Sequence, residues 1–142
     1  MAGLTIERDY DAEPARVWSA LTGGRELADW FWPPRLGAGV ETDPRVGGSY
    51  RIASEAGGMA VGGVYRAVDA PQHLSYTWHW DGEDEETVVT VDLTPTPDGT
   101  HLRLVHAGFS DAQTRDEHAE GWQDCLERLP AHLGQAPARE DG

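Results

Sequence analysis

The sequence of 142 residues contains no lysine and a single cysteine, Cys125, and its apolar runs are short. Without a lysine side chain, covalent catalysis through a lysine Schiff base is excluded. One cysteine cannot form a disulfide within the chain, and this favours a reducing compartment. Charged residues already occur among the first ten residues, so we expect no signal peptide, and no apolar run is long enough to span a membrane. We therefore expect a cytoplasmic protein.

Basic residues are few beside acidic ones. The 11 arginines stand against 25 aspartates and glutamates, which gives a formal net charge of -14 at pH 7. A field of this sign repels the phosphates of nucleic acids and of anionic membranes. We therefore expect neither a nucleic acid nor a membrane as a partner.

Several motifs of known chemistry are also missing. The chain has no phosphate-binding P-loop and no dinucleotide-binding glycine motif, and residues 48–51 lack the closing glycine of a nucleophile elbow. The spacings of its 6 histidines fit no zinc motif. These absences predict a protein without a metal or a cofactor.

Hydrophobic alternation and turn residues divide the chain into a first strand, two short helices and a run of strands. Leu4 and Ile6 alternate with polar residues, and Pro14 suits the first turn of a helix that Gly23 and Gly24 end. A second short helix is expected over residues 26–31. Strands are then expected over residues 40–43, 49–54, 60–69, 74–80 and 87–94, with a last strand after the turn at 97–99. Because the turns between them are short, the strands should form an antiparallel meander.

The last third of the chain predicts one long amphipathic helix. Ser110 and Gln113 have the spacing of a capping box, so the helix should run from about residue 111 to near Pro130, which should end or bend it. Inward-facing residues recur at intervals of three and four: His118, Trp122, Cys125, Leu126, Leu129 and Leu133. Because a lone helix must bury this stripe, we expect an α+β protein whose curved antiparallel sheet, of about six or seven strands, wraps around the helix. Residues 1–133 should form a single domain and residues 134–142 a disordered tail.

Five segments carry a resemblance to a known family. They are residues 11–22 (DAEPARVWSALT), 43–51 (DPRVGGSYR), 73–80 (HLSYTWHW), 105–109 (VHAGF) and 118–122 (HAEGW). Together they resemble the START-like SRPBCC superfamily, and within it the bacterial homologues of the Hsp90 ATPase activator. The resemblance spans about residues 4–133. It implies a helix-grip fold with a cavity between the sheet and the C-terminal helix.

The inward-facing positions are rich in aromatic residues. Tyr76, Trp78 and Trp80 share one strand face, and Tyr65 is placed inside because burying its neighbour Arg66 would be costly. Large rings pack less completely than branched aliphatic side chains, which favours a residual cavity for a flat, apolar ligand. We expect the residues that line this cavity and contact the ligand to be Trp30, Trp32, Tyr50, Ile52, Tyr65, Tyr76, Trp78, Trp80, Val89, Val91, Leu104, His106, Phe109, His118, Trp122 and Leu126.

His106 and His118 are the candidate polar residues of this cavity, because adjacent elements carry them inward. A histidine pair could act as acid and base near neutral pH, or each ring could be structural and held by a backbone partner. For His118, a ring that faces the cavity could meet a ligand without such a partner. Many relatives carry an acidic residue where this chain has Ala107, which removes one possible partner. Gly121 indicates either a close approach to the sheet or room for a ligand beside Trp122.

The favoured function is binding or sequestration of a small hydrophobic ligand, aromatic and polyketide- or lipid-like, by a non-catalytic monomer or homodimer. The first alternative is an enzyme similar to polyketide cyclases or aromatases, with His106, His118, Tyr65 or Tyr76 positioning and protonating a substrate. The second, implied by the family name, is a chaperone cofactor. An enzyme should project a buried polar group into the cavity, whereas a chaperone cofactor should expose an apolar patch.

Overall fold

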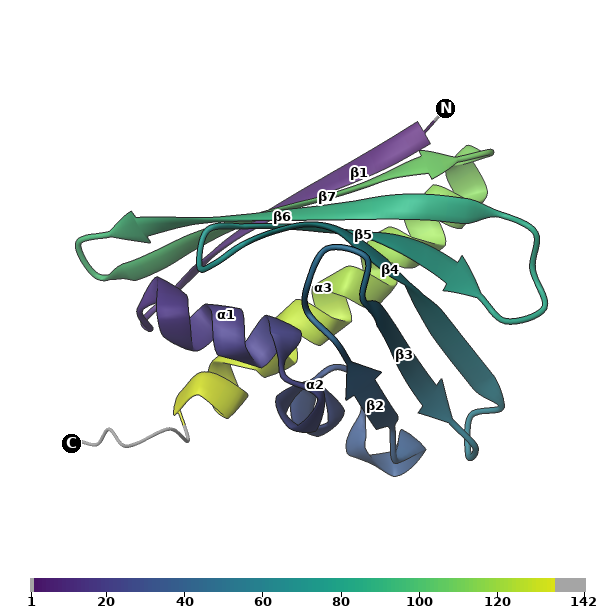
Figure 1. Cartoon of the computed structure of the whole chain (residues 1–142), viewed down its shortest axis with the longest axis horizontal. Helices are drawn as coiled ribbons and strands as arrows, with labels where there is room; N and C mark the ends of the chain where they lie inside the picture. The colour runs from purple at the N-terminus through teal and green to yellow at the C-terminus, as the bar shows by residue number, and fades with distance from the viewer. Residues whose placement is uncertain (1, 135–142) are drawn as a thin grey trace.

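The computed structural model describes residues 2–134. The chain begins with β1 (Ala2–Tyr10), α1 (Pro14–Thr22), α2 (Gly24–Trp30) and a short 3-10 turn, η1 (Pro34–Leu36). The strands that follow are β2 (Gly39–Thr42), β3 (Ser49–Ser54), β4 (Met59–Asp69), β5 (His73–Trp80), β6 (Glu86–Thr96) and β7 (Gly99–Phe109). The long helix α3 (Ala112–Gly134) comes last (Figure 1).

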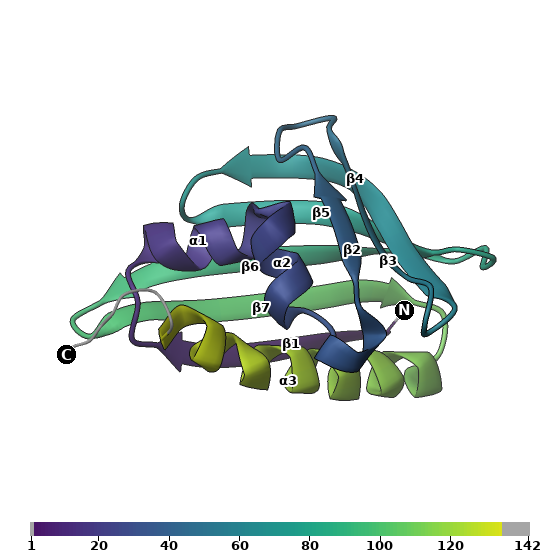
Figure 2. The same cartoon turned by 90° about the horizontal axis from the view of Figure 1, so that it is seen from below.

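The seven strands form one antiparallel sheet in the order β1-β7-β6-β5-β4-β3-β2. Strands β2 to β7 pair in chain order, and β1 pairs with β7. Figures 1 and 2 show the sheet curving over α3, which runs beside β1, while α1 and α2 lie on the same face. The predicted meander and the predicted α+β helix-grip arrangement are both confirmed.

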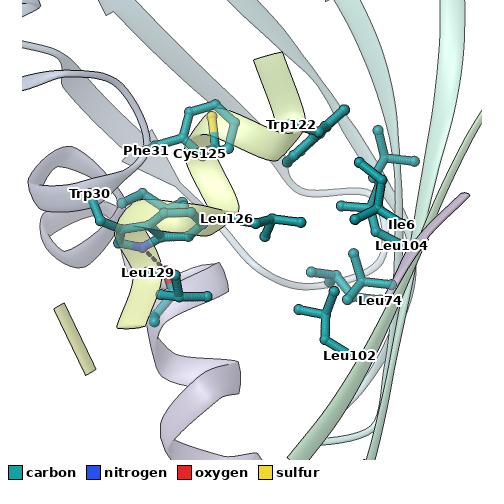
Figure 3. Packing of buried hydrophobic residues seen from close by; sticks show 14 of the residues in the cluster. Ile6, Trp30, Phe31, Leu74, Leu102, Leu104, Trp122, Cys125, Leu126 and Leu129 are labelled. Carbon is teal, nitrogen blue, oxygen red and sulfur yellow. Dashed lines mark hydrogen bonds between the residues drawn. The ribbon is translucent and has the colours of Figure 1, made fainter. Parts of the chain in front are cut away.

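Side chains from the sheet and from α3 meet in the core. Leu126 and Leu129 of α3 are fully buried opposite Leu74, Leu102 and Leu104 of the sheet (Figure 3). Burying a leucine side chain contributes about 1.5–3 kcal/mol, so this stripe is what holds the helix against the sheet.

The inward direction of β4 agrees with the prediction. Tyr65 is buried and Arg66 is exposed, as the cost of burying a guanidinium requires. The pairing of β4 with β5 shifts by one residue between Tyr65 and Ala67. The bulge accommodates the extra residue on β4 while Tyr65 keeps its place opposite Tyr76.

The start of α3 differs from the predicted capping box at Ser110 and Gln113. The backbone N–H of Thr114 donates to Oδ1 of Asp111 at 2.7 Å, so Asp111 caps the helix. This bond also lowers the pKa of the Asp111 carboxyl. Ser110 instead donates its backbone N–H to Oε2 of Glu85 at 2.7 Å. The prediction was wrong by one residue because a carboxylate from the loop before β6 binds Ser110.

The end of α3 also differs from the prediction. The helix passes through Pro130 and ends at Gly134, so Pro130 does not end it; a bend at Pro130 stays a prediction. Leu129 and Leu133, on either side of the proline, are both buried. Their packing favours one more helical turn over a break at Pro130.

The predicted tail, residues 134–142, lies outside the described residues except for Gly134, the last residue of α3. Among residues 2–134, no helix is both long enough and apolar enough to cross a membrane.

Candidate functional site

Aromatic rings from separate parts of the chain meet around Trp78 of β5. The ring centroids of Trp122 and Trp80 lie 5.3 and 5.6 Å from that of Trp78. Phe31, which follows α2, lies 6.2 Å away, and the imidazole of His106 lies 5.4 Å away. The rings pack at tilted or edge-to-face angles, which are the favourable geometries for aromatic pairs.

His106 of β7 is fully buried, and both of its ring nitrogens have side-chain partners. The indole Nε1–H of Trp122 donates to Nδ1 at 2.9 Å, and Nε2 lies 2.6 Å from Oγ1 of Thr87. Because Nδ1 accepts, the ring proton is assigned to Nε2, which donates to Thr87. Thr87 in turn donates to the backbone carbonyl of Trp78 at 3.3 Å. Burial, and to a lesser degree the neighbouring His118, lowers the pKa of His106 to about 3.

His118 of α3 is held in a similar way. Its Nδ1 lies 2.8 Å from the backbone carbonyl oxygen of Thr114, and its Nε2 accepts the indole N–H of Trp80 at 2.8 Å. The ring proton is therefore assigned to Nδ1. The imidazoles of His106 and His118 approach to 5.3 Å between centroids, as expected from their adjacent elements.

The structure contradicts the expectation for His106 and bears out the structural interpretation of His118. His106 was expected to have a backbone partner, but side chains of Thr87 and Trp122 hold it. For His118 the structural interpretation is confirmed, because the backbone carbonyl of Thr114 holds Nδ1. The ring nitrogens of both histidines are therefore engaged within the protein.

Two spaces adjoin the aromatic cluster. The larger is a cleft of about 560 Å³ between α3, residues 32–36 and β5. The smaller is an interior cavity of about 20 Å³ under the sheet, enough for about one water-sized group. Phe31, Trp78 and Trp122 line both spaces and so form the partition between them. Of these two spaces, the one at the edge of α3 thus holds nearly all of the open volume.

A groove of about 830 Å³ on the outer face of the sheet has a different character. Five carboxylate residues line it, and one of them, Asp81, forms an ion pair with Arg51 through two hydrogen bonds. This is a charged, water-facing surface, which does not suit a hydrophobic ligand. Among residues 2–134, no group of three or more His, Cys, Asp or Glu side chains is placed to hold a metal ion.

Comparison with known proteins identifies the family. A sequence model described as activator of Hsp90 ATPase homolog 1-like protein matches residues 11–134. The chain belongs to this family. A protein of solved structure from Chromobacterium violaceum is 30% identical, with a TM-score of 0.82, over 91% of this chain and 95% of that one. Another, from Mesorhizobium loti, is 30% identical, with a TM-score of 0.84, over 96% of this chain and 100% of that one.

A protein from the dynemicin biosynthetic locus is 22% identical and has a TM-score of 0.81, over 94% of this chain and 47% of that one, so the two share a fold. No curated protein matches the chain significantly.

The predicted ligand-lining residues fall into three groups, according to which of the two spaces they line. The cleft is lined by Trp32, Trp78, Trp80, His118 and Trp122. The interior cavity is lined by Tyr50, Ile52, Tyr65, Tyr76, Trp78, Val91, Leu104 and Trp122. Trp30, Val89, His106, Phe109 and Leu126 are buried and line neither space. That these residues bind a ligand stays a prediction.

The tyrosines of the interior cavity have hydroxyl groups that stay protonated. Burial raises the pKa of Tyr50 and of Tyr76, and it raises the pKa of Tyr65 to about 12. The hydroxyl of Tyr50 donates to the backbone carbonyl of Thr77 at 2.6 Å. These groups are therefore neutral hydrogen-bonding groups rather than bases.

Several cleft residues lie outside the predicted ligand-lining set, and Phe31 and Arg128 are two of them. Phe31 was assigned to the inner side of the short helix but was left out of the ligand-lining set. Arg128 of α3 donates to the backbone carbonyls of Trp30 and Phe31 at 3.0 and 2.7 Å. It also forms an ion pair with Asp124, four residues earlier in α3. The four-residue spacing could have indicated that ion pair, but no sequence signal reveals the carbonyl partners.

The structure decides between the two interpretations of Gly121. A Cβ atom built there meets no atom within 4 Å apart from its chain neighbours and the adjoining backbone of α3, so the interpretation as a close approach to the sheet is wrong. Gly121 lines the cleft and leaves room beside Trp122. Cys125 also lines the cleft but is buried, and burial raises the pKa of its thiol to about 12, which leaves it a poor nucleophile.

Proposed function

We propose that this family member binds a small, flat hydrophobic molecule in the cleft between α3 and residues 32–36. The volume of about 560 Å³ lies within the range of about 300–1,000 Å³ that is typical of small-molecule sites. The single observation that carries the proposal is the pair Trp32 and Trp80. Their indole planes are 3° from parallel, with 6.1 Å between centroids, at a cleft whose inner wall is aromatic. Parallel indole faces favour a flat ring system as the ligand.

The enzymatic alternative has less support. A histidine that acts as general acid or base needs a ring nitrogen within reach of the substrate. Both nitrogens of His106 and both of His118 already have protein partners, so catalysis would first have to break one of those hydrogen bonds. Non-catalytic binding requires no such change.

The chaperone-cofactor alternative also lacks a feature that it needs. Among residues 2–134, the large apolar side chains that are clearly exposed are Val46 and Val64. Two valines offer far less area than the several hundred Å² of a typical apolar contact patch.

The test is a titration with N-phenyl-1-naphthylamine, a neutral dye whose fluorescence rises in apolar surroundings. The acidic protein does not repel a neutral dye, and bound dye should quench tryptophan fluorescence. Gly121→Leu should fill the cleft and weaken binding at least about tenfold, a loss of about 1.4 kcal/mol. Gly121→Ala is the matched control, because it adds one methyl group where no atom lies within 4 Å and should leave the affinity nearly unchanged. Equal affinity of the folded Leu and Ala variants would exclude this cleft as the site.

A further inference from the structure

The aromatic cluster has one more indole donor than it has imidazole acceptors. Trp122 donates to His106, and Trp80 donates to His118. Each neutral imidazole has one acceptor nitrogen, so both acceptors are taken. Trp78 packs against both of these tryptophans. Its own indole Nε1–H is buried and has no hydrogen-bond partner among residues 2–134.

The other neighbours of Trp78 cannot supply the missing acceptor. Phe31, Trp80 and Trp122 present ring faces and edges, and an aromatic face is only a weak acceptor for an N–H group. Leaving a buried N–H group without an acceptor costs free energy, so most such groups in folded proteins are paired. An unpaired donor of this kind therefore calls for a functional explanation.

The position of Trp78 provides one. Its side chain is 5% exposed, and it belongs to the partition between the cleft and the interior cavity. The interior cavity beside it, at about 20 Å³, has room for a group the size of one oxygen atom. A flat ligand in the cleft that carries an oxygen on its inner edge could place that oxygen at the partition.

We infer that Trp78 is the specificity-determining donor of the site, and that its Nε1–H binds the carbonyl oxygen of a neutral aromatic ketone or quinone. This inference rests on the proposed binding function and adds the chemical class of the ligand. An indole N–H donates but cannot accept, so it selects an acceptor. A carboxylate is disfavoured because three carboxylate residues, Glu83, Glu117 and Asp124, line the same cleft against two arginines, Arg35 and Arg128. Arg128 is already engaged by Asp124 and by two backbone carbonyls, and burying an anion is costly.

The test compares 2-acetylnaphthalene with 2-isopropenylnaphthalene, in which a CH₂ group replaces the carbonyl oxygen and the shape is kept. Both probes are titrated against the wild-type protein and Trp78→Phe by displacement of N-phenyl-1-naphthylamine. The preference for the ketone over the hydrocarbon should be about tenfold greater in the wild type than in Trp78→Phe, as expected for one buried hydrogen bond. Trp80→Phe is the matched control. It removes a donor that His118 already uses, so it should weaken both probes alike and leave the preference unchanged.

A second measurement on the wild type needs no variant. In ¹⁵N-labelled protein, the indole N–H resonance of Trp78 should move downfield on addition of the ketone and not on addition of the hydrocarbon. If both probes bind but the preference is the same in Trp78→Phe and the resonance responds to both alike, the inference is overturned and the binding proposal stands. If neither probe nor the dye binds, the binding proposal itself fails.

Discussion

The hydroxyl of Tyr10 donates a hydrogen bond to the backbone carbonyl of Leu126 at an oxygen–oxygen distance of 3.2 Å. In a regular helix this carbonyl would accept the N–H of the residue four positions later, which here is Pro130. Proline has no N–H, so the last residue of β1 supplies the missing donor to α3. This bond, together with the burial of Leu129 and Leu133, explains how α3 continues through its proline.

Tyr10→Phe should therefore lower the free energy of unfolding by about 1–3 kcal/mol, because it leaves a buried carbonyl without a donor. In a Pro130→Ala background the helix regains its own N–H, and the same substitution should cost less than about 1 kcal/mol. Urea denaturation of the two single variants and the double variant measures this coupling. Equal costs in both backgrounds would show that Tyr10 stabilises the protein through packing alone.

Local patterns were enough to predict the sheet and its C-terminal helix, and the inward faces of β3 to β7. Alternation along β5 places Trp78 inside, and the cost of burying Arg66 places Tyr65 inside on β4, because burial follows the two-residue period of a strand. The stripe of α3 was predicted in the same way. These inferences needed only neighbours in the sequence.

Features that depend on distant partners were not predicted. Asp111 caps α3 because Glu85 binds Ser110, and α3 passes Pro130 because packing and Tyr10 support its last turn. The open volume was placed between the sheet and α3, but the rings fill most of that interior and the larger space is the cleft at the helix edge. Its size depends on side-chain rotamers, which spacing along the chain does not fix.

Gly63 of β4 marks a gap in the pairing with β5. The hydroxyl of Tyr50 donates to the carbonyl of Thr77, and Oγ1 of Thr77 accepts the backbone N–H of Val64 at 2.9 Å. Side chains thus replace the regular bonds between the strands at this point. A Cβ atom on Gly63 would lie 2.1 Å from the carbonyl oxygen of Thr77, so only glycine fits there without a shift of the backbone.

Gly63→Ala should accordingly lower the free energy of unfolding by about 1–3 kcal/mol, the usual cost of forcing an extra methyl group into a packed site. Gly121→Ala should instead raise it by about 0.5–1 kcal/mol, because alanine favours the helix and meets no atom within 4 Å. Opposite signs from the same chemical change, measured by urea denaturation, are the expected result. A neutral Gly63→Ala would mean that β4 can move away from β5 at little cost.

His106 should make the stability of the protein sensitive to acid. Its pKa falls from an ordinary value of 6.5 to about 3 in the folded protein, chiefly because the ring is buried. Between these values the unfolded chain binds a proton that the folded protein does not. The contribution is therefore fully present above pH 6.5 and is lost progressively as the pH falls toward 3.

His106→Gln cannot titrate and should flatten this dependence. Lowering the pH from about 7.5 to about 5.5 should cost the wild type about 1.4 kcal/mol more stability than it costs His106→Gln. The lower pH is about one unit below the pKa of histidine in the unfolded chain, and one unit corresponds to about 1.4 kcal/mol for a proton that only the unfolded chain binds. Urea denaturation across this range stays above the isoelectric point, which is about 4.6. Thr87→Val is the matched control: it removes a partner of His106 but keeps the ring buried, so it should lower stability at every pH and keep the acid dependence. If His106→Gln is as acid-sensitive as the wild type, other groups cause the loss of stability and His106 is not a buried neutral ring.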